Sequence, residues 1–201
     1  MKTLVKTLFL LLATVSVAHA AGDAAAGKGK VAMCSACHGA DGNSMVGTFP
    51  KLAGQGEKYL IKQMHDVKDG ARQIVAMTGM LDNMSDQDIA DIAAYYASQT
   101  QSPGVAKDEL LDIGERIFRA GNSETGVAAC SGCHSPSGVG NAPGGFPRLA
   151  GQHADYLAST LKAYQTETRN NDGDSKIMRG VAARLSDKEI KAVANYIAGL
   201  R

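Results

Sequence analysis

The chain has 201 residues, of which 44% are hydrophobic and 20% are charged, with a formal net charge of +1 at pH 7. This near-neutral balance excludes the strongly basic surface that nucleic-acid-binding proteins usually carry. The length is enough for two domains of ordinary small size.

Residues 1–20 have the pattern of a secretory signal peptide. Lys2 and Lys6 give a positive start, residues 4–17 are mostly apolar, and small residues lead up to Ala20. The apolar stretch is short for a membrane span, so we predict cleavage after Ala20 rather than a permanent anchor. The mature chain, residues 21–201, would then be exported to the periplasm, an oxidising compartment that suits its four cysteines.

One five-residue pattern occurs twice and uses every cysteine of the chain. Each copy has two cysteines separated by two residues, with a histidine directly after the second, which is the attachment pattern of c-type haem. The two thiols can bond to the two vinyl groups of one porphyrin while the neighbouring imidazole binds its iron. The copies are Cys34-Ser35-Ala36-Cys37-His38 and Cys130-Ser131-Gly132-Cys133-His134.

Disulfides and zinc are the competing interpretations of these cysteines. A redox-active Cys-x-x-Cys pair usually follows a β-strand, and no segment here has a strand pattern. A zinc ribbon closes over about 15–20 residues, whereas these pairs are 96 residues apart. We therefore predict two covalently bound haem c groups, attached through all four cysteines and ligated by His38 and His134.

The second half of the mature chain repeats the first. Residues 49–55 match residues 146–152 at an offset of 97, and the offset is 96 at the cysteines and 101 at the last helix. This period predicts two domains, residues 21–100 and residues 101–201, joined by a linker at about residues 98–107.

Each copy is expected to be helical. We expect a first helix over residues 23–33, and apolar residues recur at helical spacing in residues 57–67 and in a segment that follows Ser85. The counterparts are residues 108–120 and 154–164 and the segment after Ser186. Ser186 with Glu189 has the pattern of a capping box, and Ser85 with Asp88 is a close variant. We predict an all-α fold in which each domain wraps around one haem.

The repeat also suggests the second axial ligand of each iron. Met178 is the only methionine of the second half and lies eight residues before Ser186; Met77 lies eight residues before Ser85. We predict these two as ligands, with Met80 as the alternative in the first domain. An ordinary core role for the flexible methionine side chain is the competing interpretation. His65 and His153 are the alternative ligands, but they do not align with each other, so we expect both to lie at the surface.

Several repeated residues around the haem motifs have two interpretations each. The carbonyl groups of Pro50 and Pro147 could accept a hydrogen bond from Nδ1 of His38 and His134, or the prolines could form plain turns. Leu52 and Leu149 are expected to pack at the haem edge or in the core. For the repeated tyrosines we expect core packing, with a hydroxyl contact to a haem propionate as the alternative. These are Tyr59, Tyr95, Tyr156 and Tyr196.

Taken together, these motifs resemble the dihaem cytochrome c4 family over the whole mature chain. The resemblance is carried by the two haem motifs, by Phe-Pro-x-Leu-Ala-Gly-Gln in both halves, by residues 77–80, and by residues 170–174 and 177–180. It implies two tandem class I cytochrome c domains that face each other about a pseudo-twofold axis, with haem propionates near the interface. It also implies the axial ligand set His38, Met77, His134 and Met178.

The resemblance further implies a periplasmic electron carrier rather than an enzyme. Members pass electrons from a donor such as cytochrome bc1 toward a terminal oxidase such as the cbb3 type, often in contact with the membrane surface without spanning it. Redox proteins would be the partners, with no small-molecule substrate. The alternative is a dihaem peroxidase or sulfur-compound dehydrogenase with one labile axial site. Against it, neither distal segment offers an acid–base pair and no cysteine is left over for a sulfur substrate.

Overall fold

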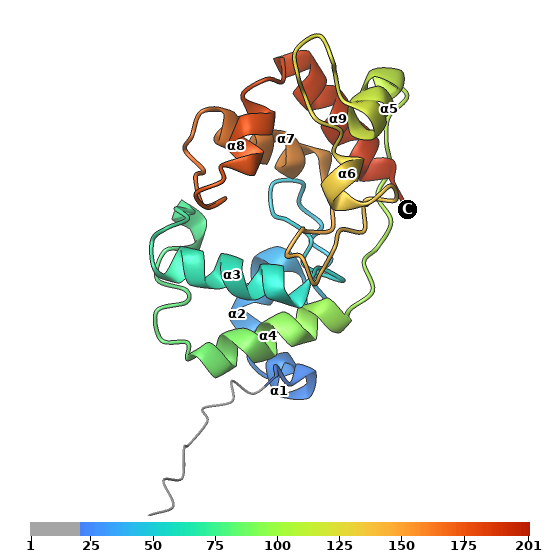
Figure 1. The fold of residues 1–201 in the computed structure, drawn as a ribbon. Helices are drawn as coiled ribbons and strands as arrows, with labels where there is room; N and C mark the ends of the chain where they lie inside the picture. Colours follow the sequence, from blue (N-terminus) through green and yellow to red (C-terminus); the bar gives the residue numbers. More distant parts are fainter. Residues whose placement is uncertain (1–20) are drawn as a thin grey trace, which may run out of the picture.

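The structure is a computed structural model that describes residues 21–201, so the predicted signal peptide lies outside the described residues. Within this range the chain forms nine α-helices and one 3₁₀ helix, with two isolated β-bridges and no β-strand. Figure 1 shows two helical lobes that follow each other along the chain. The prediction of an all-α fold with two repeated units is confirmed. None of the helices in residues 21–201 is long and apolar enough to cross a bilayer.

The N-terminal lobe packs its helices around a small core. That core contains Leu60 from the middle helix and Ile92, Ala93 and Tyr96 from the last helix, joined by Val31. The long middle and last helices agree with the helices expected from periodicity. The elements of the lobe are α1 (Ala24–Lys28), α2 (Ala32–His38), α3 (Glu57–Lys68), the 3₁₀ helix η1 (Val75–Met77) and α4 (Asp86–Ser98).

The C-terminal lobe repeats this arrangement with a larger apolar core. Ile117 and Phe118 from its first helix pack on Ile190, Val193 and Ile197 from its last helix. The distal segment before that last helix is a true α-helix here, whereas the N-terminal lobe has only a single 3₁₀ turn. The elements of the lobe are α5 (Leu111–Ala120), α6 (Ser131–His134), α7 (Ala154–Gln165), α8 (Ile177–Ala182) and α9 (Asp187–Gly199).

Both last helices begin with a complete capping box. The Ser85 hydroxyl accepts from the Asp88 backbone N–H at 3.2 Å, and the Asp88 carboxylate accepts from the Ser85 backbone N–H at 2.9 Å. Ser186 and Glu189 make the same pair of bonds in α9. The shorter carboxylate of Asp88 therefore serves as well as glutamate, because both reach the free backbone donor of the cap residue.

The prediction of one continuous helix over residues 23–33 was wrong. The segment is divided into α1 and α2 by a turn, and Gly29 ends α1 by donating its backbone N–H to the Ala26 carbonyl. The break lets Val31 turn into the core, where it is 5% exposed. In the C-terminal lobe the helix expected from residue 108 begins at Leu111, because Leu110 adopts a left-handed conformation with φ of 63°.

In both lobes the first helix crosses the last helix at a glycine. A Cβ atom at Gly27 would lie 2.0 Å from the Asp91 carbonyl oxygen, and one at Gly114 would lie 2.2 Å from that of Ala192. Real side chains do not approach a backbone so closely, so only glycine allows this crossing. The repeat is thus a repeat of backbone geometry as well as of sequence.

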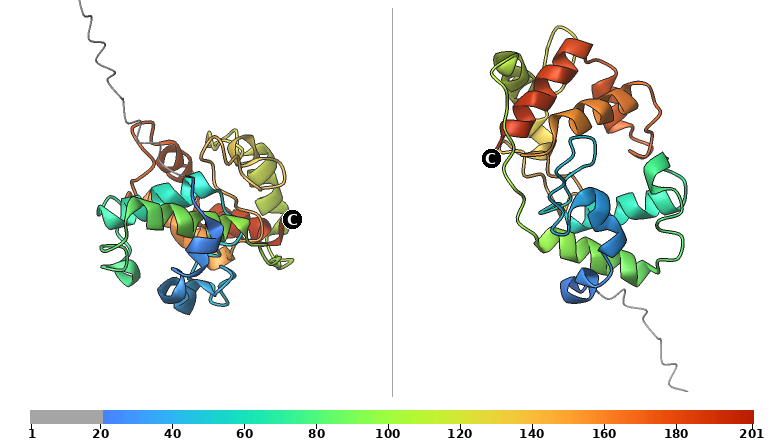
Figure 2. Two further views of the ribbon diagram at one scale, coloured as in Figure 1. Left: turned by 90° about the horizontal axis from the view of Figure 1, so that it is seen from below. Right: turned by 180° about the vertical axis from the view of Figure 1, so that it is seen from behind.

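The segment between α4 and α5 runs along one side of the molecule and connects the lobes (Figure 2). It begins one residue after the start of the predicted linker, because Ser98 still belongs to α4, and it extends three residues further, to Leu110. Side chains from both lobes hold it: Asn43 accepts from the Ser102 N–H at 2.7 Å, and Asn195 accepts from the Lys107 N–H at 2.9 Å. The linker is therefore bonded to both lobes along its length.

The lobes meet through the loops that carry the Phe-Pro motifs, each of which reaches toward the opposite lobe (Figure 1). Gln152 accepts from the Lys51 N–H and donates to the Lys51 carbonyl, both at 2.8 Å. Gln55 does the same with Arg148, at 2.7 and 3.0 Å. The two pairs correspond through the 97-residue offset, so the contact has the isologous pattern of a two-fold interface.

Candidate functional site

The two haem motifs lie at equivalent places in the two lobes. Helix α2 ends at His38 and helix α6 ends at His134. Within residues 21–201 no disulfide joins any of the four cysteines. Cys34 and Cys130 pack against the N-terminal and C-terminal cores, respectively. Each motif thus presents two thiols and one imidazole beside an apolar core.

The histidines of the motifs are buried and oriented. His38 is 8% exposed and His134 is 6% exposed. In each ring Nδ1 lies 2.9 Å from a proline carbonyl oxygen, that of Pro50 for His38 and that of Pro147 for His134. A carbonyl can only accept, so Nδ1 carries the proton and Nε2 keeps its lone pair for a metal.

Burial also keeps both rings neutral. It lowers the pKa of His38 and of His134, and the hydrogen bond to the proline carbonyl opposes this only in part. The edges of Phe49 and Phe146 face the two rings at centroid distances of 6.4 and 6.2 Å. Of the two interpretations of the prolines, the structure therefore favours the one in which their carbonyls accept from the imidazoles and orient them.

The methionines of the N-terminal lobe fall into three groups. Met45 is 93% exposed and Met33 is 55% exposed, which places them in solvent. Met64 and Met84 pack against the core. Met77 and Met80 remain, both half-buried in the distal segment; Met77 ends η1. In the C-terminal lobe the half-buried Met178 lies in the first turn of α8.

The two other histidines have different surroundings. His65 is half-buried on α3, with its ring 4.0 Å from the exposed carboxylate of Asp86. His153 was expected at the surface, but its Nε2 lies 2.9 Å from the Ser44 carbonyl of the opposite lobe. This prediction was wrong because His153 directly follows Gln152, and both belong to the contact between the lobes.

The repeated leucines and tyrosines divide between core and interface. Leu52 and Leu149 pack against the cores of their lobes. Tyr95 is buried and donates to the Ala40 carbonyl at 2.9 Å. Tyr59 and Tyr156 differ from the expected core packing, because each hydroxyl accepts a hydrogen bond from an arginine of the opposite lobe.

These arginines, Arg72 and Arg169, were not recognised from the sequence. They correspond through the same 97-residue offset as Tyr59 and Tyr156, which is the signal that could have identified them. Arg72 donates to Tyr156 at 3.1 Å and Arg169 donates to Tyr59 at 3.1 Å. The side chains cross between the lobes in both directions.

Two buried polar atoms of residues 21–201 have no hydrogen-bonding partner: Arg72 Nε and the Tyr96 hydroxyl. Buried polar groups without partners are rare in native proteins and indicate a missing ligand or water. Burial raises the pKa of the Tyr96 phenol well above its usual value, so it stays protonated. These two orphaned donors fit an added cofactor that carries acceptor groups.

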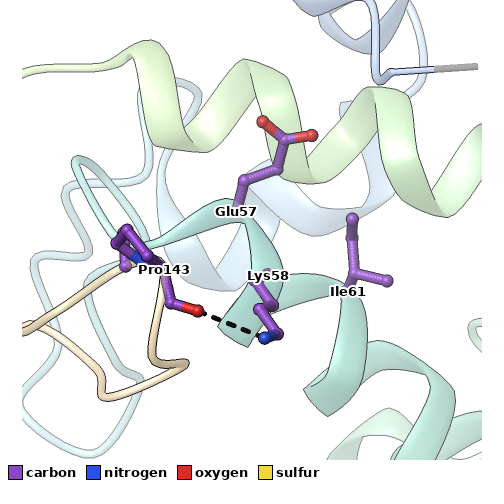
Figure 3. A pocket seen from close by; sticks show the side chains of 5 residues that line it. Glu57, Lys58, Ile61 and Pro143 are labelled. Atoms are coloured by element: carbon purple, nitrogen blue, oxygen red, sulfur yellow. Dashed lines mark hydrogen bonds between the residues drawn. The ribbon is translucent and has the colours of Figure 1, made fainter.

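A shallow hollow of about 440 Å³ lies between the start of α3 and the loop at Pro143 (Figure 3). Lys58 bridges it with a 3.2 Å hydrogen bond to the Pro143 carbonyl. None of its lining residues is a histidine, cysteine or methionine, so it does not contain the predicted ligands. The lining residues are Glu57, Lys58, Ile61, Ala142 and Pro143.

The fold and the two motifs define a c-type cytochrome with two haem-binding units. The family model for cytochrome c matches the chain twice, over residues 24–100 and 112–201. The chain is 59% identical to cytochrome c4 of Pseudomonas aeruginosa over the full length of both proteins. The chain belongs to the cytochrome c4 family, and it carries two covalently bound haem c groups.

Solved structures agree with this assignment. The crystal structure of reduced recombinant cytochrome c4 from Pseudomonas stutzeri superposes with a TM-score of 0.89 at 55% identity, covering 90% of this chain and all of that one. A more distant relative, 37% identical over 87% of this chain and 81% of its own length, is the thiosulfate dehydrogenase electron acceptor of Thiomonas intermedia. The protein is an electron carrier, as the cytochrome c4 relatives are.

Proposed function

We propose that the chain carries electrons in the periplasm through two haem irons, each ligated by one histidine and one methionine. The axial ligands are His38 with Met77 and His134 with Met178, and the thioether bonds are made by Cys34, Cys37, Cys130 and Cys133. The observation that carries this proposal is the buried, neutral histidine of each motif, whose Nδ1 is bonded to a proline carbonyl at 2.9 Å.

Each bound haem supplies an iron that takes up and releases one electron. The residues around it set how readily this happens. A thioether sulfur opposite an imidazole raises the reduction potential. The proline carbonyls orient the imidazoles and increase their basicity. With both axial positions filled by side chains, the sites exclude substrate, which is why we propose a carrier and not a peroxidase or dehydrogenase.

The proposed organisation follows the repeat. Residues 1–20 are a signal peptide cleaved after Ala20, residues 21–100 hold the first haem, and residues 101–201 hold the second. Support comes from the apolar cores, one formed within residues 31–96 and the other within residues 117–197. Two haem units in one chain would allow one end to receive an electron while the other delivers one.

For partners, we propose a cytochrome bc1 complex as donor and a cbb3-type terminal oxidase as acceptor, at the periplasmic surface of the membrane. The support is membership of the cytochrome c4 family. A thiosulfate dehydrogenase is a second candidate donor, because the relative from Thiomonas intermedia is named as the electron acceptor of such an enzyme. Stopped-flow reduction by each purified donor, followed by oxidation with the oxidase, separates the two.

The ligand assignment is tested by optical spectroscopy of the holoprotein. Ferric haem with a methionine ligand has a weak absorption band in the red, and we expect Met178→His to remove half of its intensity and to lower the potential of the second haem. Met77→Leu should remove the other half, whereas the matched Met80→Leu should leave the band intact. If Met80→Leu removes it instead, the ligand of the first haem is Met80. A high-spin ferric signal in the resting wild-type protein would contradict the carrier function.

A further inference from the structure

The hydrogen bond that orients His38 continues beyond Pro50 into the opposite lobe. The Pro50 carbonyl accepts from Nδ1 of His38 at 2.9 Å. The N–H of the same peptide group belongs to Lys51, and it donates to Oε1 of Gln152 at 2.8 Å. A single peptide group therefore connects the imidazole of the N-terminal lobe to a side-chain amide of the C-terminal lobe.

The C-terminal lobe has the same chain of hydrogen bonds in the opposite direction. The Pro147 carbonyl accepts from Nδ1 of His134 at 2.9 Å. The N–H of that peptide group belongs to Arg148, and it donates to Oε1 of Gln55 at 2.7 Å. Gln55 lies in the N-terminal lobe, so each motif histidine is linked to a glutamine of the other lobe, and the two chains share no residue.

The surroundings of both glutamines fix which end of the amide faces the peptide group. Oε1 of Gln152 also accepts from the His153 N–H at 3.0 Å, and its Nε2 donates to the Lys51 carbonyl at 2.8 Å. Gln55 makes the equivalent bonds in the other direction. Two N–H donors at one end and a carbonyl at the other permit only one orientation of the amide. The oxygen is therefore held against the peptide N–H in both chains.

The two chains are also shielded from water. His38, Lys51 and Gln152 are 8%, 6% and 4% exposed, and Gln55 and His134 are each 6% exposed. Water cannot compete for these groups, and hydrogen bonds in series polarise one another in a medium of low dielectric constant. A change at the glutamine should therefore be felt at the imidazole.

We propose that Gln152 and Gln55 are positioning residues that each tune the reduction potential of the haem in the opposite lobe. This inference rests on the histidine ligation of the proposed function. By accepting from the peptide N–H, the glutamine oxygen shifts electron density onto the proline carbonyl, which then accepts more strongly from Nδ1 of the imidazole. The imidazole becomes a more basic ligand, and a more basic ligand stabilises ferric iron. Each glutamine therefore lowers the potential of the haem across the interface.

The experiment measures both midpoint potentials of the holoprotein in Gln152→Leu and Gln55→Leu, which remove the acceptor. Haem methyl resonances in proton NMR spectra, assigned to a lobe by their nuclear Overhauser contacts, report the two potentials separately. We expect Gln152→Leu to raise the potential of the first haem only, although the substitution lies in the second lobe. The preference for ferrous iron should rise about threefold, or about 28 mV at about 59 mV per tenfold change. Gln55→Leu should raise the potential of the second haem only.

The sign of the shift and a second signal distinguish this role from a purely structural one. A loosened interface admits water, which favours the ferric charge and lowers the potentials. The matched control is Gln101→Leu, because Oε1 of Gln101 accepts from Nε of Arg148 between the lobes but belongs to neither chain. It should raise neither potential. In the ferrous protein, the Nδ1 proton of His38 should move to lower frequency in Gln152→Leu as its hydrogen bond weakens, and that of His134 should stay in place.

Three outcomes overturn the proposal: a fall of both potentials in the glutamine variants, equal shifts of both haems, or shifts no larger than in Gln101→Leu. Should Gln152→Leu fail to fold, Gln152→Asn places the amide one methylene short of the Lys51 N–H and should still raise the first potential by a smaller amount. An unchanged first potential in that variant contradicts the proposal. The proposed function is judged separately from the methionine band of the wild type. If that band is present and the crossed pattern of shifts is absent, only this inference fails.

Discussion

The two lobes share one backbone crossing between first and last helix but stabilise it with different chemistry. In the N-terminal lobe Lys30 lies 2.5 Å from an Asp91 carboxylate oxygen and 2.6 Å from that of Asp88. At the equivalent position, three residues after the crossing glycine, the C-terminal lobe has Ile117, which is 1% exposed. This position therefore carries an ion pair in the N-terminal lobe and a buried apolar side chain in the C-terminal lobe.

The crossing of the first and last helices requires a glycine in both lobes but accepts different residues beside it. Both lobes need glycine at the contact, since a Cβ would meet a carbonyl oxygen in each. The residue three positions after the glycine differs in kind between the lobes, a partly exposed lysine in one and a buried isoleucine in the other. Asp91 corresponds to Ala192. The C-terminal lobe therefore has apolar residues in place of both the cation and its acidic partner. The lobes should therefore respond differently to mutation and to acid.

The largest difference is expected for the apolar contact itself. Phe118 is fully buried between α5 and α9, and Phe118→Ala should destabilise the C-terminal lobe by about 3–5 kcal/mol. The matched Val31→Ala in the N-terminal lobe removes fewer buried atoms and should cost less. Hydrogen exchange of α9 and of α4, in increasing denaturant, reports the two lobes separately. Equal losses in both lobes would mean that Val31 contributes as much to its lobe as the larger Phe118 does.

A smaller and equal effect is expected at the crossing glycines. Gly27→Ala and Gly114→Ala each force the helices apart, at a cost of about 1–3 kcal/mol for an overpacked contact. Gly29→Ala is the control, because its Cβ would lie 3.5 Å from the nearest atom, an ordinary contact distance. The same exchange experiment measures all three. If one glycine tolerates alanine, the crossing geometry of the two lobes is not equivalent.

The smallest effect is a selective response to acid. Hydrogen bonds from the Asp23 N–H, Lys30 and Gln87 lower the pKa of Asp91 to about 2, below its value of about 3.9 in an unfolded chain. The stability this carboxylate contributes is present above about pH 4 and is lost as the pH falls toward 2. Between these values α1 should exchange faster than α5, after correction for intrinsic rates. Asp91→Asn should abolish the difference, and a difference that persists in this variant would assign it to another group.

Much of the candidate site could be predicted from sequence because its chemistry is local. A haem needs two thiols and an imidazole within five residues, and that pattern can be seen without any knowledge of the fold. The repeat then aligned Met77 with Met178 and both capping boxes with each other. The break between α1 and α2 was missed although Gly27 and Gly29 lie in the segment, because a glycine by itself does not fix where a helix ends.

The sequence by itself determined the fold class, the number of haem groups and the two-unit organisation, since each depends on residue types at short spacing and on a repeat of that spacing. Only the tertiary structure decided which residues meet between the lobes. Arg169 and Gln63 are 106 residues apart, and His153 bonds to Ser44 across 109 residues. Such contacts follow from how two folded surfaces fit together, and no periodicity or local motif of the chain encodes that fit.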